Sequence, residues 1–539
     1  MKLYDPEKKI WSGAKYDVIY NSNVNLGYLI LNVLKKTPDM VTQVSADTDA
    51  EMTCREMRLR TMKIASYLME TNLKQGDVVG VIAANSENLA PVVFACLLLG
   101  LPINFLSPVM NEHDIIFMYS KTKPKAIFCD GNIAKNVQGA IDKMTIKPVI
   151  FTLMTKVAGL QFIDDWILVD FDEKNFVFPN TKHVDTLTAV ILCSSGTTGL
   201  PKGVCHSHSQ LIERMLPAWN LRECNYEVLF NFSSLYWMSG LWFVLVGTLY
   251  NLKRIITTKD FDPDWMINIF SRYRITHFLT SPSALVALLR NRDFMPLKSV
   301  KVLMASGSIL SKGISQAIEP FLPNGMISSS YGTTEAGFLA ESFNSSHRAG
   351  SVGVPAPNVQ MKIVNDFGTK LGTNEEGEIC VKPSVLFSGY FNDEESTKST
   401  IKDGWIFTGD IGYFDEEGFL FIIDRKKDVL KFNGYQVYPS ELETIINEID
   451  GVKKSCVVGV FEQDKGNDLI FGFVEKDPTK EQLSADYILE YVNNKVIDAK
   501  MLRGGVQFMK NFPTSPSGKI RRFDVKKVAQ EFYDKTIKI

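Results

Sequence analysis

Short apolar runs alternate with helical patterns through most of residues 1–424. VVGVIAA (78–84) and KAIFCD (125–130) are typical of buried strands, and PVVFACLLLG (91–100) between them has a helical pattern. Strand, helix and strand in that order require crossover connections and predict a mainly parallel sheet. TAVILCSSG (188–196) predicts another strand, which runs into a glycine-containing loop.

The pattern changes near residue 424. The stretch DGWIFTGDIGYFDEEGFLFIIDRKKD (403–428) is typical of short strands and tight turns, and its charged end predicts a solvated turn. A helix is predicted within 438–451, because Pro439 suits a first helical position and Gly451 ends the pattern. Its apolar face consists of Leu442, Ile445, Ile446 and Ile449.

Further strands are predicted at 455–461 and 468–476, followed by a helix and a basic C-terminal segment. We therefore expect an α/β protein. Residues 1–424 form a large N-terminal region of several subdomains with mainly parallel sheets, and residues 425–539 form a small C-terminal α+β domain.

The composition, 45% apolar and 22% charged over 539 residues, is that of an ordinary globular protein with a large core. A formal charge of −2 gives no sign of a surface that binds polyanions, so we expect no nucleic-acid partner. The eight cysteines are scattered without C-x-x-C spacing, which indicates reduced core residues in an intracellular protein.

The N-terminus lacks the apolar core of a signal peptide, and no segment is predicted to cross a membrane. The most apolar stretch, 235–250, is too short and predicts a buried helix. The final Ile-Lys-Ile is at best a weak peroxisomal signal, so we expect a cytoplasmic or peroxisomal location.

The segment ILCSSGTTGLPKGVCHSH (191–208) combines glycines, hydroxyl side chains and one lysine, Lys202. Glycines allow backbone N–H groups to face an anion, and the hydroxyls add donors, so the segment suits a polyphosphate. It is not a Walker A loop, because Lys202 lies between Pro201 and Gly203. A plain flexible turn is the alternative.

SSGTTGLPKGV (194–204) is very similar to the signature loop of the adenylate-forming enzymes, which include acyl-CoA synthetases, 4-coumarate-CoA ligases and beetle luciferases. Four more motifs resemble that family's motifs in the same order: YGTTEAG (331–337), WIFTGDIGY (405–413), DRKKDVLKFNGYQVYPSELE (424–443) and PTSPSGKIRR (513–522). The resemblance implies that a carboxylate attacks the α-phosphorus of ATP, with Mg²⁺, and that coenzyme A then displaces AMP. No carrier domain is expected, so the thiol is free coenzyme A.

By this resemblance, one set of residues should surround the β- and γ-phosphates: Ser194, Ser195, Gly196, Thr197, Thr198, Gly199 and Lys202. Tyr331, with Gly332 and Thr333 of the same motif, should lie at the adenine. Thr334 and Glu335 should hold the α-phosphate and Mg²⁺, which normally takes one carboxylate, phosphate oxygens and waters.

Asp410 should accept hydrogen bonds from the ribose hydroxyls, assisted by Arg425. Lys519 should reach the α-phosphate and the substrate carboxylate, because two anions must meet there. The resemblance also implies that the C-terminal domain rotates about a hinge at 424–427. This rotation would withdraw Lys519 and bring Lys431 and Gly434 to the active site for thioester formation.

The substrate region departs from the luciferases and coumarate ligases, many of which carry a histidine where this chain has Met238. Ser329 and Ser330 replace a usual Gln-Gly, and the loop 304–310 is one residue shorter. We expect Trp237, Met238, Gly240 and Gly307 to face the substrate.

No cationic residue stands out that could bind a second carboxylate of the substrate. The leading substrate is therefore a hydrophobic monocarboxylic acid, such as a medium- or long-chain fatty acid. An aromatic acid-CoA ligase, a luciferase-type monooxygenase and a non-catalytic adenylate binder are the alternatives. The absent histidine disfavours the luciferase-type monooxygenase. The non-catalytic binder is disfavoured because the residues expected to bind phosphate and the two expected lysines are all present.

Overall fold

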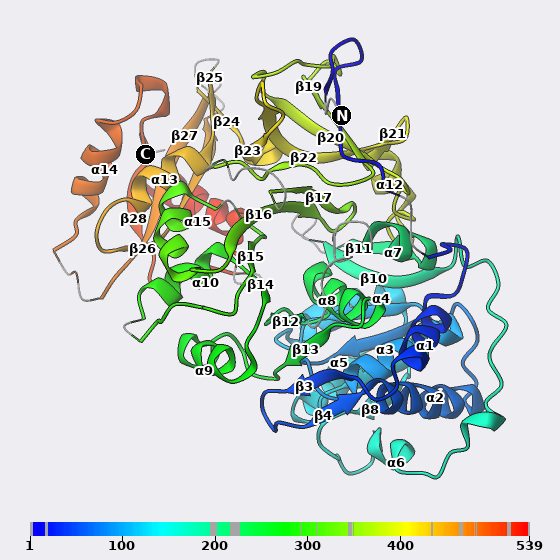
Figure 1. The fold of residues 1–539 in the computed structure, drawn as a ribbon. Coiled ribbons are helices and arrows are strands. Elements are labelled where there is room, and N and C mark those ends of the chain that lie inside the picture. Colours follow the sequence, from blue (N-terminus) through cyan, green and yellow to red (C-terminus); the bar gives the residue numbers. More distant parts are fainter. Residues whose placement is uncertain are drawn as a thin grey trace.

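The computed structural model describes most of the chain: residues 4–16, 20–194, 202–215, 227–291, 293–308, 310–342, 348, 350–432, 435–462, 467–478, 480, 482–514 and 519–536. Within these ranges, no helix has the length and apolar character needed to cross a bilayer. The ribbon shows two stacked sheets, a third sheet beside them and a separate C-terminal layer (Figure 1).

The first sheet is parallel except at one edge. Its strands, in spatial order, are β11 (Lys202–Ser207), β10 (Thr188–Ser194), β6 (Ile103–Leu106), β5 (Val79–Ile82), β7 (Ala126–Cys129), β8 (Val149–Thr152) and β9 (Gln161–Phe162). β10 and β11 pair antiparallel, with Ser194 opposite Lys202. The two ends of the predicted phosphate loop are therefore fixed by the edge of this sheet.

The second sheet is parallel from β16 to β3 and antiparallel at both edges. Its strands are β18 (Val354–Pro355), β17 (Gly337–Glu341), β16 (Met326–Thr333), β15 (Val302–Ala305), β14 (His277–Thr280), β12 (Val228–Asn231), β13 (Lys253–Ile256), β3 (Val41–Ser45) and β4 (Glu51–Thr53). The YGTTEAG motif spans the turn between β16 and β17.

Helices fill the space between these sheets and cover their outer faces. The largest core combines α1 (Leu26–Lys36), α2 (Cys54–Glu70), α3 (Leu89–Leu99) and α8 (Met238–Leu249) with strands of both sheets. α4 (Glu112–Thr122) and α5 (Ala134–Asp142) pack on the first sheet, and α9 (Pro263–Tyr273), α10 (Pro282–Leu289) and α11 (Lys312–Ile318) pack on the second. β5, β6 and β7 are buried at every residue, since both faces of the sheet are covered, and this explains the nearly continuous apolar runs.

A third sheet is antiparallel throughout. It contains β1 (Tyr4–Asp5), β2 (Ile10–Ser12), β19 (Val359–Val364), β20 (Gly377–Pro383), β22 (Trp405–Phe414), β21 (Ile401–Lys402) and β23 (Leu420–Arg425). The register of β22 and β23 places Asp410 opposite Arg425, which brings two predicted site residues together. The short helix α12 (Glu394–Thr400) precedes β21.

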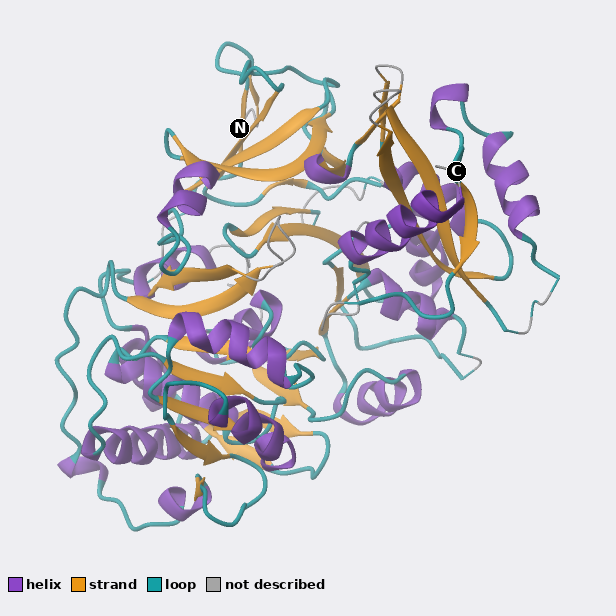
Figure 2. Ribbon diagram, turned by 180° about the vertical axis from the view of Figure 1, so that it is seen from behind, coloured by secondary structure: helices purple, strands orange, loops and turns teal. Residues whose placement is uncertain are grey.

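The C-terminal layer contains a hairpin and a small sheet. Its strands are β24 (Leu430–Phe432), β25 (Tyr435–Val437), β26 (Val452–Glu462), β27 (Asn467–Lys476) and β28 (Gly505–Phe508). α13 (Pro439–Asn447) and α14 (Ala485–Asn493) share one core with this sheet, and α15 (Arg522–Thr536) packs in another core (Figure 2).

The structure confirms the expected α/β class and the buried helix within 235–250, which is α8. Pro439 begins α13 as predicted, but α13 ends at Asn447, before the predicted end at Gly451. Ile449 is therefore buried in the same core from the turn after the helix, and Gly451 has a φ of 92° there. The cysteines of the described residues are buried and unpaired, as the sequence indicated.

Candidate active site

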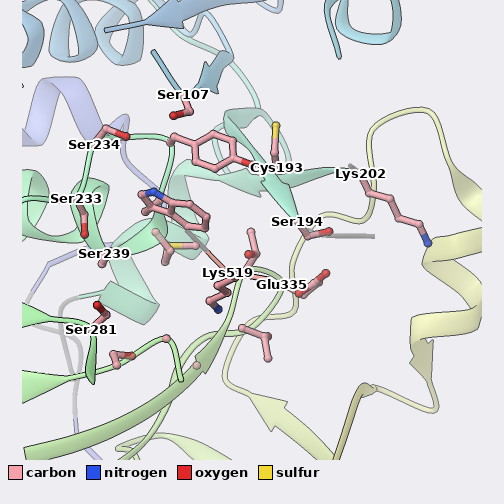
Figure 3. Close-up of a pocket in the computed structure, with 18 of the residues that line it drawn as sticks. Ser107, Cys193, Ser194, Lys202, Ser233, Ser234, Ser239, Ser281, Glu335 and Lys519 are labelled. Carbon is pink, nitrogen blue, oxygen red and sulfur yellow. The ribbon is translucent and has the colours of Figure 1, made fainter. Parts of the chain in front are cut away.

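A large cavity of about 2060 Å³ lies where the sheets and the C-terminal layer meet. Its wall includes the end of β10, the β16–β17 turn, the start of α8 and the segment that carries Lys519. Figure 3 shows Ser194, Glu335 and Lys519 converging within it. Residues predicted from distant motifs therefore share one space.

Asp410 is the centre of a buried polar cluster. The Tyr331 hydroxyl donates a hydrogen bond of 2.5 Å to Asp410 Oδ2, and Arg425 Nε lies 2.6 Å from Asp410 Oδ1. Burial raises the pKa of Asp410 above its usual value, while the Arg425 guanidinium opposes this rise. Arg425 lines the cavity, so these two partners hold the Asp410 carboxylate just behind the cavity wall.

Glu335 and Thr334 are held by residues that the sequence reasoning did not select. The Tyr390 hydroxyl donates to Glu335 Oε1 at 2.8 Å, and His206 Nε2 donates to the Thr334 carbonyl oxygen at 2.9 Å. Tyr390 and His206 also line the cavity. His206 directly follows the signature loop in HSH, which was the available sequence signal, whereas Tyr390 carried no signal of its own.

Lys202 has a defined position at the base of the predicted phosphate loop. Its Nζ donates to Ser396 Oγ of α12 at 2.8 Å and lies 4.9 Å from the centroid of the Tyr390 ring. In Figure 3 its side chain points away from Glu335. Ser194 lies in the cavity wall, while Ser195, Gly196, Thr197, Thr198 and Gly199 lie outside the described residues.

The two predicted lysines of the C-terminal layer have different surroundings. Lys519 lines the cavity. Partial desolvation of its ammonium group, and then the nearby Arg425 guanidinium, lower the pKa of Lys519 below the usual lysine value, while Asp410 opposes this shift. An isolated antiparallel β-bridge pairs Thr514 with Ile520, next to Lys519. Lys431 is not part of the described cavity wall: it lies on β24, where its N–H donates to Asp468 Oδ2 at 2.8 Å.

Gly434, which was predicted to act with Lys431, lies outside the described residues. The structure therefore places Lys519, and not Lys431, beside Asp410 and Arg425. This arrangement is the one expected for the first half-reaction of an adenylate-forming enzyme.

The predicted substrate residues divide into two groups. Trp237, Met238 and Gly307 line the cavity, but Gly240 is buried and is not among its described lining residues. A Cβ on Gly240 would lie 2.2 Å from the Ser234 carbonyl oxygen. Gly240 thus permits α8 to pack closely against the preceding turn. The prediction that Gly240 faces the substrate is not supported by this position.

Several aromatic rings were not selected from the sequence but line the same apolar part of the cavity. Trp242 and Phe338 are stacked with centroids 6.3 Å apart at an interplanar angle of 13°, and Tyr236 meets Trp237 edge-on at 4.6 Å. Such rings form a rigid apolar wall. Trp242 was assigned to the helix core, and only its place in the fold shows that it also reaches the cavity.

Two family models match most of the chain. The one described as AMP-binding enzyme matches residues 32–391, and the one described as AMP-binding enzyme C-terminal domain matches residues 441–519. The chain therefore belongs to the AMP-binding enzyme family, and its class is that of the AMP-forming acid–thiol ligases.

The chain is similar over nearly its full length to named relatives. The probable 4-coumarate–CoA ligase 1 of Dictyostelium discoideum is 29% identical over 538 residues, covering 95% of this chain and 97% of the relative. The peroxisomal OPC-8:0-CoA ligase 1 of Arabidopsis thaliana is 29% identical over 501 residues, covering 90% of each. ATP-bound MatB from Rhodopseudomonas palustris has the same fold, with a TM-score of 0.82, 23% identity and coverage of 95% and 99%.

Proposed function

We propose that this enzyme uses ATP to convert a hydrophobic carboxylic acid to an acyl-adenylate and then transfers the acyl group to coenzyme A. The observation that carries the proposal is the shared cavity. Lys519, Glu335 and Arg425 lie on one part of its wall, with Asp410 paired to Arg425 behind it, and Trp237, Met238, Trp242 and Phe338 lie on another part.

The polar part of the wall suits a nucleotide. Asp410 lies behind this wall, held by Arg425 and the Tyr331 hydroxyl, and would accept hydrogen bonds from the ribose hydroxyls, with the adenine beside Tyr331. Lys519 supplies positive charge where the substrate carboxylate attacks the α-phosphorus. The carboxylate oxygen forms the new P–O bond, and pyrophosphate leaves with the electrons of the bond that breaks.

A magnesium ion fits this wall only together with phosphates. Among the described residues, no group of three or more His, Cys, Asp and Glu side chains is arranged to hold a metal. Glu335 offers one carboxylate, with Oε1 already accepting from Tyr390. Since Mg²⁺ keeps waters and phosphate oxygens as ligands, Glu335 would complete its coordination and the ion would neutralise phosphate charge.

The second half-reaction needs a different arrangement of residues 425–539, which we propose as the mobile domain after residues 1–424. Lys431 and Gly434 would then reach the adenylate. Among the described residues, the polar contacts between the two parts gather close to the proposed hinge at 424–427. Arg425 pairs with Asp410, Lys426 pairs with Glu378 and Asp366, and the Ser440 N–H donates to Asp424 Oδ2 at 2.9 Å. Tyr438 donates to Glu376 Oε2 at 3.0 Å.

The acid is a medium- or long-chain fatty acid in our leading proposal. An aromatic acid is the second candidate, favoured by the stacked Trp242 and Phe338 rings and by relatives named 4-coumarate–CoA ligases. Flat substrates pack well against such rings.

ATP–pyrophosphate exchange over matched panels of fatty, phenylpropanoid and dicarboxylic acids tests the proposal. Exchange with at least one hydrophobic acid, and thioester formation when coenzyme A is added, is the expected result. Exchange with none of these acids would refute it, and exchange only with dicarboxylic acids would refute the substrate class.

A further inference from the structure

A second cavity, of about 610 Å³, shares Lys202 with the main cavity. We call it the lysine pocket. Among the described residues, its basic lining side chains are Lys121, Lys123, Lys125 and Lys202, and its acidic ones are Asp77 and Asp393. It therefore has an excess of positive charge in a chain whose formal charge is −2.

The local fold concentrates these charges. Lys121 lies in the last turn of α4, Lys123 caps that helix in a left-handed conformation with φ of 48°, and Lys125 leads into β7. The Lys125 N–H donates to the Val78 carbonyl oxygen at 2.9 Å, which fixes this segment beside β5. Three lysines at alternate positions are thus held at one place on the surface.

Most of this charge is not neutralised by neighbouring side chains. Lys125 pairs with Asp77 at 2.8 Å. The Asp393 carboxylate accepts a hydrogen bond from the Ser396 N–H at 2.9 Å. This hydrogen bond holds the pKa of Asp393 below its usual value, and the positive charges of Lys202 and Lys121 add to the effect. Lys121, Lys123 and Lys202 thus have one further acidic residue, Asp393, among the described lining residues, so the pocket keeps an excess of positive charge.

The lysine pocket adjoins the main cavity, and Tyr390 lines both. Lys202 belongs to both walls. Lys121 Nζ lies 4.1 Å from the centroid of the Phe117 ring, and Phe117 lines the main cavity. A phosphate group near Lys202 thus has a second cluster of positive charge next to it.

We propose that the lysine pocket binds inorganic pyrophosphate as a second site beside the one where the adenylation reaction releases it. This inference rests on the proposed function for the origin of the pyrophosphate. Pyrophosphate is small and carries several negative charges, which match several separated ammonium groups. Occupying the pocket would move the product away from the α-phosphorus and so oppose the reverse reaction.

The test uses the full-length protein with Lys121→Glu and Lys123→Glu combined. The control combines Lys135→Glu and Lys147→Glu, which changes the net charge equally at exposed lysines outside both described cavity walls. Calorimetry with pyrophosphate alone measures binding, and product inhibition by pyrophosphate measures its effect on adenylation. Inorganic phosphate and adenosine 3′,5′-bisphosphate serve as further probes, the second standing for the nucleotide of coenzyme A.

The expected result is a pyrophosphate Kd at least about tenfold higher in the pocket variant, with the KM for ATP within about twofold. Pyrophosphate should inhibit adenylation by the pocket variant at least as strongly as by the wild type, because the pocket no longer draws the product away from the α-phosphorus. The control should match the wild type. Equal pyrophosphate binding by the two variants would overturn the inference, as would tighter binding of the bisphosphate than of pyrophosphate. If no acid supports exchange, the proposed function fails, and calorimetry still decides whether the pocket binds pyrophosphate.

Discussion

Lys519 and Lys431 offer a sharp test because the structure gives them different surroundings. Lys519 lines the cavity beside Asp410 and Arg425, whereas Lys431 lies on the β24–β25 hairpin outside the described cavity wall. We predict that Lys519→Ala slows adenylate formation and that Lys431→Ala leaves it within about twofold of the wild type and slows acyl transfer to coenzyme A.

The size of the first effect follows from the charge that Lys519 supplies. A preorganised donor at developing negative charge is worth about 10²–10³ in rate, or about 2.7–4 kcal/mol. Folding should change little, since the Lys519 side chain is exposed to solvent within the cavity and surface substitutions usually stay within about 0.5 kcal/mol. Lys431→Ala also preserves the backbone hydrogen bond to Asp468.

Pyrophosphate release under single-turnover conditions measures the first step. Thioester formation from preformed adenylate, followed by chromatography, measures the second. Thermal unfolding of both variants is the control for folding. Equal defects of the two variants in both steps would refute the division of roles, and unchanged pyrophosphate release in Lys519→Ala would refute the role of Lys519.

Asp410→Asn should raise the KM for ATP about ten- to a hundredfold, since a charge-assisted acceptor for the ribose is lost; an unchanged KM in the exchange assay would contradict this role. Gly240→Ala should destabilise the fold by about 1–3 kcal/mol, because its Cβ would meet the Ser234 carbonyl oxygen, and urea unfolding measures this directly. Because the pKa of Lys519 is lowered and its protonated form is required, adenylation should fall at an alkaline pH below the usual lysine value, and Lys519→Arg should move that fall upward. A fall at the same pH in both proteins would assign it to another group.

The sequence predicted the strands, the buried α8 and the helix that begins at Pro439 because each depends on a local pattern of apolar residues. It also selected Arg425, Glu335 and Lys519 from separate motifs, and the fold brings all three to one cavity. Asp410 and Tyr331, also selected, bond to each other behind its wall.

Residues that act through packing were harder to find. Tyr390 and His206 hold Glu335 and Thr334 only because β11 and the segment before α12 pass beside the β16–β17 turn. Gly240 was misplaced because a glycine at a helix start suits both a substrate contact and close backbone packing, and only the position of the Ser234 carbonyl distinguishes them.

The origin of the oxygen atoms in AMP tests the central claim most directly. The protein is incubated with ATP, Mg²⁺, coenzyme A and an active acid labelled with ¹⁸O in its carboxylate, and AMP is examined by mass spectrometry. If the carboxylate attacks the α-phosphorus, one labelled oxygen appears in AMP at each turnover. Unlabelled AMP, or label in inorganic phosphate together with formation of ADP, would contradict an acyl-adenylate.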